Sequence, residues 1–285
     1  MGVAFRAQAR PRARLKRAES ATSVAMALKK SLGQHFLRDA SMIARIVDAI
    51  APAPGQRVVE IGPGDGAMTL PLLDRAGAIT AIELDRDLHA PLSVRAASHG
   101  QLDLIRASVL EVDFSTLAQR LGGPLRVVGN LPYYLSSPIL FHCTSHLGAI
   151  EDMHFMLQLE VVQRIVATPG GKDYGRLGVM LQLACEAEML LHVPPEAFQP
   201  PPKVESAVVR LRPRPATARP DVDARRLADI VRDAFGQRRK TLANALGRLL
   251  DAEAIRAAGI DPRARAETLP PEAFVALARQ PAASQ

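Results

Sequence analysis

Short apolar runs alternate with helix-like patterns along most of this 285-residue chain. In the intervals between the runs, apolar residues recur three and four positions apart, which is the spacing of one face of a helix. Glycine, aspartate or proline marks the end of the runs. The alternation is typical of a mostly parallel sheet that is covered by helices on both faces. The predicted strands are 57–61, 78–82, 102–105, 125–129 and 153–158, and two more lie near 185–193 and 204–213.

The pattern changes at two places, which divides the chain into three segments. Residues 1–27 are rich in arginine and alanine and show no apolar periodicity, so we expect a disordered basic extension. All predicted strands fall within 28–214, which we interpret as one α/β domain. Residues 215–285 follow a linker rich in proline and arginine, and their helical patterns predict a small helical domain. The helices expected there are 222–235, 238–250, 251–258 and 271–279.

Charge adds to this picture in the last third of the chain. The formal net charge is +7, and twelve basic but only five acidic residues lie between Lys203 and Arg248. Such a basic block favours contact with nucleic-acid phosphates, for which Lys203, Arg238, Arg239 and Lys240 are the candidate residues. The alternative interpretation is a set of solvated helix faces.

Several classes of protein are excluded by what the sequence lacks. No apolar run approaches the roughly 20 residues that cross a bilayer, so we expect a soluble, cytoplasmic protein without a membrane partner. The two cysteines, Cys143 and Cys185, stand far apart and suit free thiols in a reducing compartment. His142 and His146 lack the adjacent glutamate of a zinc-protease motif, so no metal site is predicted.

A glycine-rich stretch, EIGPGDG at 60–66, follows the first predicted strand directly. Gly62 and Gly64 let the backbone turn tightly and approach a ligand at the start of a helix. Glu83 ends the second strand, where a carboxylate can accept hydrogen bonds from both hydroxyls of a ribose. Enzymes that use NAD and enzymes that use S-adenosylmethionine share these features. Glu60 favours S-adenosylmethionine, because an acid there repels a pyrophosphate but attracts an ammonium group.

A second motif, NLPY at 130–133, stands where the fourth predicted strand ends. It suits methyl transfer to the exocyclic amine of adenine, which must be held with its lone pair towards the methyl donor. The side-chain oxygen of Asn130 and the carbonyl of Leu131 can accept the two amine protons, while Pro132 fixes the turn. The ring of Tyr133 can then stack on the base. Hydride transfer has no use for this motif, which leaves an NAD oxidoreductase as a distant alternative.

Eight segments together carry a resemblance to a known family. They are SLGQHFL (31–37), EIGPGDG (60–66), IELDRDL (82–88), NLPY (130–133), MHFMLQLEVVQRIVA (153–167), YGRLGVM (174–180), EAFQPPPKVESAVVRL (196–211) and FGQRRKTLANAL (235–246). In this combination the chain resembles the small-subunit ribosomal RNA adenine dimethyltransferases over about residues 28–280. The resemblance implies the class I methyltransferase fold, which is Rossmann-like with a mostly parallel seven-stranded sheet, and a small C-terminal helical domain.

The resemblance also implies an activity and its partners. Members transfer four methyl groups from S-adenosylmethionine, two to each of two adjacent adenosines in a hairpin near the 3′ end of small-subunit RNA. They act on the immature small ribosomal subunit, and we expect a monomer. Two related functions stay open: a resistance-type methylase of one large-subunit RNA adenine, and a nucleic-acid-binding relative without turnover. The long tail after residue 215 argues against the first of these, and the intact NLPY motif argues against the second.

The family's site positions carry over residue by residue. The cofactor positions fall on His35, Leu37, Gly62, Glu83, Ser108 and Asn130. Ser108 stands where the family usually has an aspartate that accepts from the adenine amine of the cofactor, and Asp113 is the candidate substitute. Phe198 matches a second aromatic residue, which is expected on the other face of the target base. The alternative for Phe198 is that it packs beneath the polyproline turn that follows.

Overall fold

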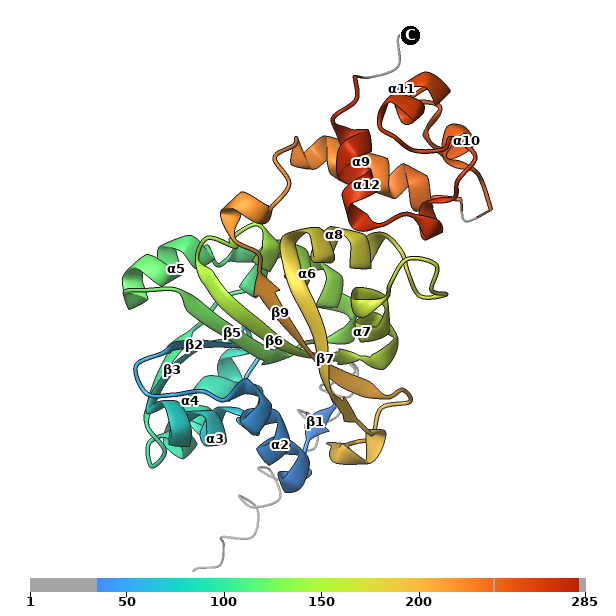
Figure 1. Cartoon of the computed structure of the whole chain (residues 1–285). Helices are drawn as coiled ribbons and strands as arrows, with labels where there is room; N and C mark the ends of the chain where they lie inside the picture. Colours follow the sequence, from blue (N-terminus) through green and yellow to red (C-terminus); the bar gives the residue numbers. More distant parts are fainter. Residues whose placement is uncertain (1–34, 238, 282–285) are drawn as a thin grey trace, which may run out of the picture.

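The computed structural model describes residues 35–237 and 239–281 and contains the predicted seven-stranded sheet (Figure 1). The strand order is β4-β3-β2-β5-β6-β9-β7. The first five strands in that order run parallel, and β9 runs antiparallel to both of its neighbours. All seven predicted strands are confirmed. Their bounds are β2 Arg57–Ile61, β3 Ala78–Ile82, β4 Gln101–Ile105, β5 Leu125–Asn130, β6 Ile150–Gln158, β7 Cys185–Val193 and β9 Ser206–Pro213.

Helices cover both faces of this sheet. The helices on the first face are α2 (Ala40–Ile50), α3 (Thr69–Ala76) and α4 (Arg86–Ala96). The helices on the second face are α5 (Phe114–Leu121), α6 (Ser136–Thr144), α7 (Leu159–Val166) and α8 (Arg176–Ala184). Successive side chains of a strand point to opposite faces, so Val58 belongs to the first core and its neighbour Val59 to the second. The central strands β2, β3 and β5 are buried on both sides, which explains why they read as mostly apolar runs.

A third core joins the C-terminal helices to the rest of the protein. These helices are α9 (Ala224–Phe235), α10 (Leu242–Leu246), α11 (Ala252–Ala257) and α12 (Pro271–Ala278). Val179 and Leu183 of α8 pack in this third core, whereas Leu181 of the same helix packs in the core of the sheet. The Tyr174 hydroxyl adds a 2.8 Å hydrogen bond to the carbonyl of Leu269. The predicted boundary after residue 214 lies next to the end of β9 at Pro213. Helix α8 precedes this boundary in sequence, but its side chains pack in the cores of both parts.

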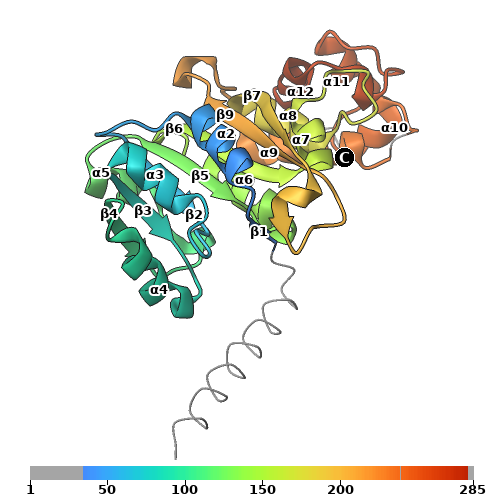
Figure 2. The same ribbon diagram turned by 90° about the horizontal axis from the view of Figure 1, so that it is seen from below.

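Two details differ from the sequence prediction. The helix predicted for 238–250 is wrong in its length, because α10 spans only Leu242–Leu246. It begins after a turn in which the Lys240 N–H donates to the Gln237 carbonyl, at 2.9 Å. In addition, β1 (Phe36–Leu37) pairs antiparallel with β8 (Phe198–Gln199), a ladder that the sequence did not predict. Both views place β1 far from α10 and α11 (Figure 1, Figure 2).

The predicted extension 1–27 lies outside the described residues. Within the part of the chain that the structure describes, no helix has the length and apolar character needed to span a bilayer.

Candidate functional site

Three of the predicted site residues meet where β3, β2 and β5 end side by side. Gly62 follows β2, Glu83 follows β3, and Asn130 is the last residue of β5. The parallel registers align these ends, since Ile61 pairs with Ile82 on one side and with Gly129 on the other. A Cβ atom on Gly129 would lie only 2.7 Å from the Ile61 carbonyl oxygen, so the close approach of β5 to β2 requires glycine. Ligands of open α/β sheets bind at this edge.

The glycine loop, residues 62–66, leaves backbone open to a ligand. Gly62 and Gly64 have φ angles of 65° and 58°, a left-handed conformation that side chains disfavour. Nothing lies within 4 Å of the position a Cβ atom would take on Gly62, so a ligand can reach the backbone there. The loop is tied to β3, because the Gly62 N–H donates to the Ile82 carbonyl at 2.9 Å.

Glu83 links the end of β3 to the glycine loop. Its Oε1 accepts a 2.8 Å hydrogen bond from the Asp85 N–H, and its Oε2 accepts from the Gly64 N–H at 3.4 Å. The side chain is half-buried, and each carboxylate oxygen has a second lone pair. The carboxylate is therefore held in place while it retains the capacity to accept from hydroxyl groups.

Glu60 lies just before the loop and is only 2% exposed. The Thr69 hydroxyl donates to it at 2.7 Å. Burial raises the pKa of Glu60 to about 7 and the Glu83 charge adds to this rise, while the Thr69 hydrogen bond opposes it. A nearby cation would hold this carboxyl in its charged form. The sequence points to Glu60 but gives no sign of Thr69, which is nine residues away.

Two arginines hold the glycine loop from outside, and the sequence analysis missed both. Arg38 forms an ion pair with Asp65, and Arg95 donates a hydrogen bond to the Asp65 carbonyl. The segment after β1 is thereby joined to the loop. No local signal identifies these contacts, because the partners are far apart in the sequence.

The NLPY turn presents two acceptors that have no partner among the described residues. Among the residues described, none forms a hydrogen bond with the Asn130 side chain, and none donates to the carbonyl of Leu131. The Leu131 side chain is 1% exposed, and its N–H donates to the Met156 carbonyl at 3.1 Å, which anchors the turn to β6. The Pro132 carbonyl is engaged by the Leu135 N–H at 2.9 Å. The turn is thus rigid, with an amide and a carbonyl left available.

Tyr133 is held from two sides. Its hydroxyl lies 2.9 Å from the hydroxyl of Ser206, which is fully buried at the start of β9. The ring of His35 stacks on it, with ring centres 6.3 Å apart, and His35 Nδ1 lies 2.8 Å from the Pro200 carbonyl oxygen. Burial raises the pKa of Tyr133, so its hydroxyl stays protonated at neutral pH. The sequence analysis did not identify Ser206, because its contact with Tyr133 joins residues far apart in the chain.

Phe198 is buried in this structure. It pairs with Leu37 across the β1–β8 ladder, both side chains belong to the first core, and 4% of Phe198 is exposed. The ring therefore offers little surface for stacking on a base in this conformation. The structure agrees with the alternative of a packing role, and the role on the target base stays a prediction.

Ser108 and Asp113 follow β4 in different settings. Ser108 is half-buried before the short helix η1 (Val109–Glu111), and its side chain makes no capping hydrogen bond. Asp113 caps α5, since its carboxylate accepts from the Thr116 N–H at 2.7 Å, and it lies 3.7 Å from His146. Asp113 is thus occupied elsewhere, and of these two candidates Ser108 is the one whose side chain makes no capping hydrogen bond.

The candidate RNA contacts lie in two exposed segments. Lys203 precedes β9, while Arg239 and Lys240 lie in the turn before α10, and all three are exposed. None of them pairs with an acidic side chain among the residues described. Arg238 lies outside the described residues.

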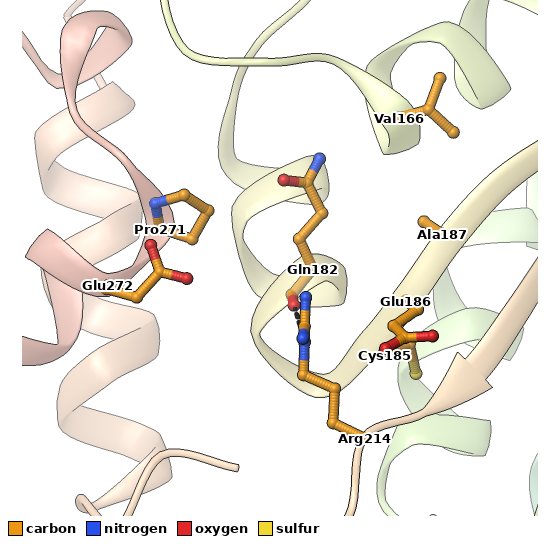
Figure 3. Close-up of a pocket in the computed structure, with 8 residues that line it drawn as sticks. All are labelled: Val166, Gln182, Cys185, Glu186, Ala187, Arg214, Pro271 and Glu272. Carbon is orange, nitrogen blue, oxygen red and sulfur yellow. Dashed lines mark hydrogen bonds between the residues drawn. The ribbon is translucent and has the colours of Figure 1, made fainter. Parts of the chain in front are cut away.

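A cavity of about 340 Å³ lies elsewhere, between the sheet and the C-terminal helices (Figure 3). Its lining includes Cys185 at the amino end of β7, Arg214 after β9, and Glu272 on α12. β7 runs parallel to β5 and β6, so its amino end lies at the opposite end of the strands from Asn130. This cavity therefore does not belong to the candidate site. Residues 35–237 and 239–281 contain no group of His, Cys, Asp and Glu side chains that could hold a metal ion.

Comparison with known proteins agrees with the resemblance carried by the motifs. The family model described as "Ribosomal RNA adenine dimethylase" matches residues 25–282. A protein of Xanthomonas campestris pv. campestris (strain 8004), "Ribosomal RNA small subunit methyltransferase A", is 59% identical over 250 residues, which are 88% of this chain and 95% of the relative. A protein of the same name from Xanthomonas euvesicatoria pv. vesicatoria (strain 85-10) is 59% identical over 251 residues, again 88% of this chain and 95% of the relative.

Solved structures share the fold over most of this chain. A dimethyladenosine transferase from Plasmodium falciparum has a TM-score of 0.73 and 22% identity, with 85% of this chain and 96% of that chain covered. The 23S rRNA methyltransferase ErmE has a TM-score of 0.63 and 30% identity, with 85% of this chain and 97% of that chain covered.

Proposed function

The chain belongs to the ribosomal RNA adenine dimethylase family, and from this premise we propose that it methylates the exocyclic amines of two adjacent adenosines in small-subunit ribosomal RNA. S-adenosylmethionine supplies the methyl groups. One observation carries the assignment. The Asn130 amide, which has no hydrogen-bond partner among the described residues, and the ring of Tyr133 stand at the end of β5, beside the glycine loop and Glu83. A methyl donor and a base amine can meet at such an edge.

The cofactor half of the site fits S-adenosylmethionine. We assign the glycine loop at Gly62 and Gly64, where the space beside Gly62 is open, to the methionine part of the molecule. The Glu83 carboxylate suits the two ribose hydroxyls, because it is already fixed by the N–H groups of Asp85 and Gly64. The buried Glu60 suits the ammonium group, directly or through water, since a cation relieves the cost of its charge. His35, Leu37 and Ser108 complete the assigned set.

The base half of the site fits an adenine that has left its stack. Asn130 and the Leu131 carbonyl are the two acceptors for the amine protons, which aims the nitrogen lone pair towards the methyl group. Tyr133 stacks on the base, with its ring position set by Ser206 and His35. No proton must leave before the nitrogen attacks, so the chain contributes positioning and preorganised acceptors.

The substrate RNA is assigned to the basic segments. We propose that Lys203, Arg238, Arg239 and Lys240 contact phosphates of a hairpin near the 3′ end of the small-subunit RNA, within the immature subunit. Among the described residues, Lys203, Arg239 and Lys240 are exposed and have no acidic partner, so they can make such contacts. We also propose that the protein acts in the cytoplasm as a monomer. In this proposal residues 28–214 form the catalytic segment, and residues 215–285 form a helical RNA-binding segment.

Transfer of radiolabelled methyl groups tests the proposal. Purified small subunits that lack the modification, and large subunits, are each incubated with the full chain, and labelled nucleotides are mapped. Label on two adjacent adenosines of the small-subunit RNA is the expected result.

Label on one adenine of the large-subunit RNA would instead support the resistance-type function, which the likeness to ErmE makes the second candidate. RNA binding without transfer of any label would support the non-catalytic relative.

A further inference from the structure

Some exposed apolar side chains are close in sequence to residues of the candidate site. Among the described residues, the large hydrophobic side chains that are exposed are Leu84, Val94, Leu110, Tyr134, Met189 and Val204. Leu84 directly follows Glu83, and Leu110 lies two residues after Ser108. Tyr134 follows Tyr133, and Val204 lies two residues before Ser206. Tyr134 is the aromatic member of this group, and 68% of it is exposed.

Tyr133 and Tyr134 are neighbours with opposite surroundings. Both belong to the short helix η2 (Tyr133–Leu135), which lies between Pro132 and α6. Tyr133 is half-buried and hydrogen-bonded to Ser206. No hydrogen bond or ring contact joins Tyr134 to any residue within 35–237 or 239–281. The protein therefore presents an unpacked aromatic ring next to the one assigned to the target base.

An exposed ring at this place suits a nucleobase. When one adenine leaves its stack to enter the pocket, each neighbouring base on the strand loses a stacking partner. Those neighbours are joined to the target by the RNA backbone, so they must lie at the mouth of the pocket. An aromatic side chain there can restore the lost stacking with any base, because every base has a flat face. Lys203 is also exposed three residues before Ser206, which adds positive charge beside the same mouth.

We propose that Tyr134 stacks on the nucleobase next to the adenine that enters the pocket. The proposal rests on the function assigned above and adds a second contact with the RNA. The ring acts on binding and not on the reacting amine. Loss of Tyr134 is therefore expected to weaken RNA affinity while turnover at saturating RNA changes little.

The test compares the full-length chain with Tyr134→Ala, Tyr134→Phe and the control Met189→Ala, which truncates an exposed apolar side chain on β7. The probe is a fluorescently labelled RNA hairpin that carries the target adenines. Base stacking on an aromatic side chain contributes about 1–3 kcal/mol by alanine substitution, so Tyr134→Ala should raise the RNA dissociation constant about 5- to 150-fold. The RNA dissociation constants of Tyr134→Phe and Met189→Ala should stay within about twofold of that of the unaltered protein. Phe keeps the ring, and Met189 lies on β7, outside the candidate site.

Two further RNAs, abasic on the 5′ or the 3′ side of the target, identify the stacked base. On one of them the difference between the unaltered protein and Tyr134→Ala should disappear. The inference is overturned if Tyr134→Ala binds the intact hairpin as the unaltered protein does, or if the difference persists on both abasic RNAs. Absence of methyl transfer by the unaltered protein would instead contradict the proposed function.

Discussion

The Thr69 hydroxyl donates a 2.7 Å hydrogen bond to the carboxylate of Glu60, two residues before the glycine loop. This bond favours the charged carboxylate, but burial outweighs it and raises the pKa of Glu60 from 4.5 to about 7. Glu60 therefore exchanges its proton near neutral pH, beside the glycine loop to which we assign a cationic ligand.

The stability of the ligand-free protein should depend on this group. The folded pKa lies above the unfolded value, so ionisation of Glu60 destabilises the fold progressively from about pH 4.5 to about pH 7. Glu60→Gln removes the charge and keeps an acceptor for Thr69. We expect the variant to gain stability relative to the unaltered protein by on the order of 3 kcal/mol between pH 4.5 and pH 8. Urea unfolding at both pH values measures this, and a pH-independent difference would contradict it.

Binding of S-adenosylmethionine should release a proton near pH 7. An ammonium group beside Glu60 stabilises its carboxylate, which lowers the pKa of the bound form. Calorimetry in two buffers of different ionisation enthalpy measures the number of protons released. The same titrations with Glu60→Gln are the control, and equal release by the two proteins would assign the proton to another group.

Glu83→Ala should weaken S-adenosylmethionine binding at least tenfold while the protein stays folded. The change removes a charged acceptor from two ribose hydroxyls, and hydrogen bonds to charged groups contribute about 1.5–3 kcal/mol each. Calorimetry gives the affinity. Glu151→Ala, which removes an exposed glutamate on β6, is the matched control. Unchanged affinity in a folded Glu83 variant would remove Glu83 from the cofactor site.

Asn130→Ala should separate RNA binding from chemistry. The hydrogen bond to the amine strengthens as positive charge develops on it, so its loss lowers turnover more than affinity. The loss of one such preorganised hydrogen bond costs about 10²–10³ in rate. Turnover at saturating RNA and cofactor is the measurement, with cofactor affinity determined in the same variant. The control is Asn244→Ala, which removes an exposed amide on α10. Turnover near that of the unaltered protein would reduce the NLPY turn to a structural element.

Neutralising Arg238, Arg239 and Lys240 together should weaken RNA binding across sequences. Each lost phosphate contact lowers the slope of log affinity against log salt by about 0.7–0.9. Arg120→Gln is the control. Arg120 is an exposed cation near the end of α5 that pairs with Asp103 of β4, the outermost strand on the side of the sheet away from β7. A slope that does not change would mean that none of the three residues contacts a phosphate.

The central strands could be predicted because they are buried on both faces of the sheet. Such strands are continuous apolar runs that end at glycine or a polar residue, and 57–61 and 78–82 were predicted with their observed bounds. The meeting of Gly62, Glu83 and Asn130 followed from parallel topology, which brings carboxyl ends to one edge. Gly129, a glycine inside a strand, was a further signal of close backbone approach.

Other features had no local signal. The β1–β8 ladder has two residues on each strand, too few for any periodicity, and its partners are far apart in the sequence. The contact between Tyr133 and Ser206 and the burial of Phe198 depend on where β9 and β8 are placed by the whole fold. The short α10 was overestimated because apolar spacing alone does not show the turn that precedes it.

Helix α8 contributes side chains to the core of the sheet and to that of the C-terminal helices, so neither part can move without disturbing a packed interior. The distance between the turn that carries Arg239 and Lys240 and the end of β5 that carries Asn130 is therefore fixed. An RNA that contacts both places must span this distance. Two RNAs with identical sequences around the target adenine but different folds would then be distinguished by the distance from that adenine to the contacted phosphates.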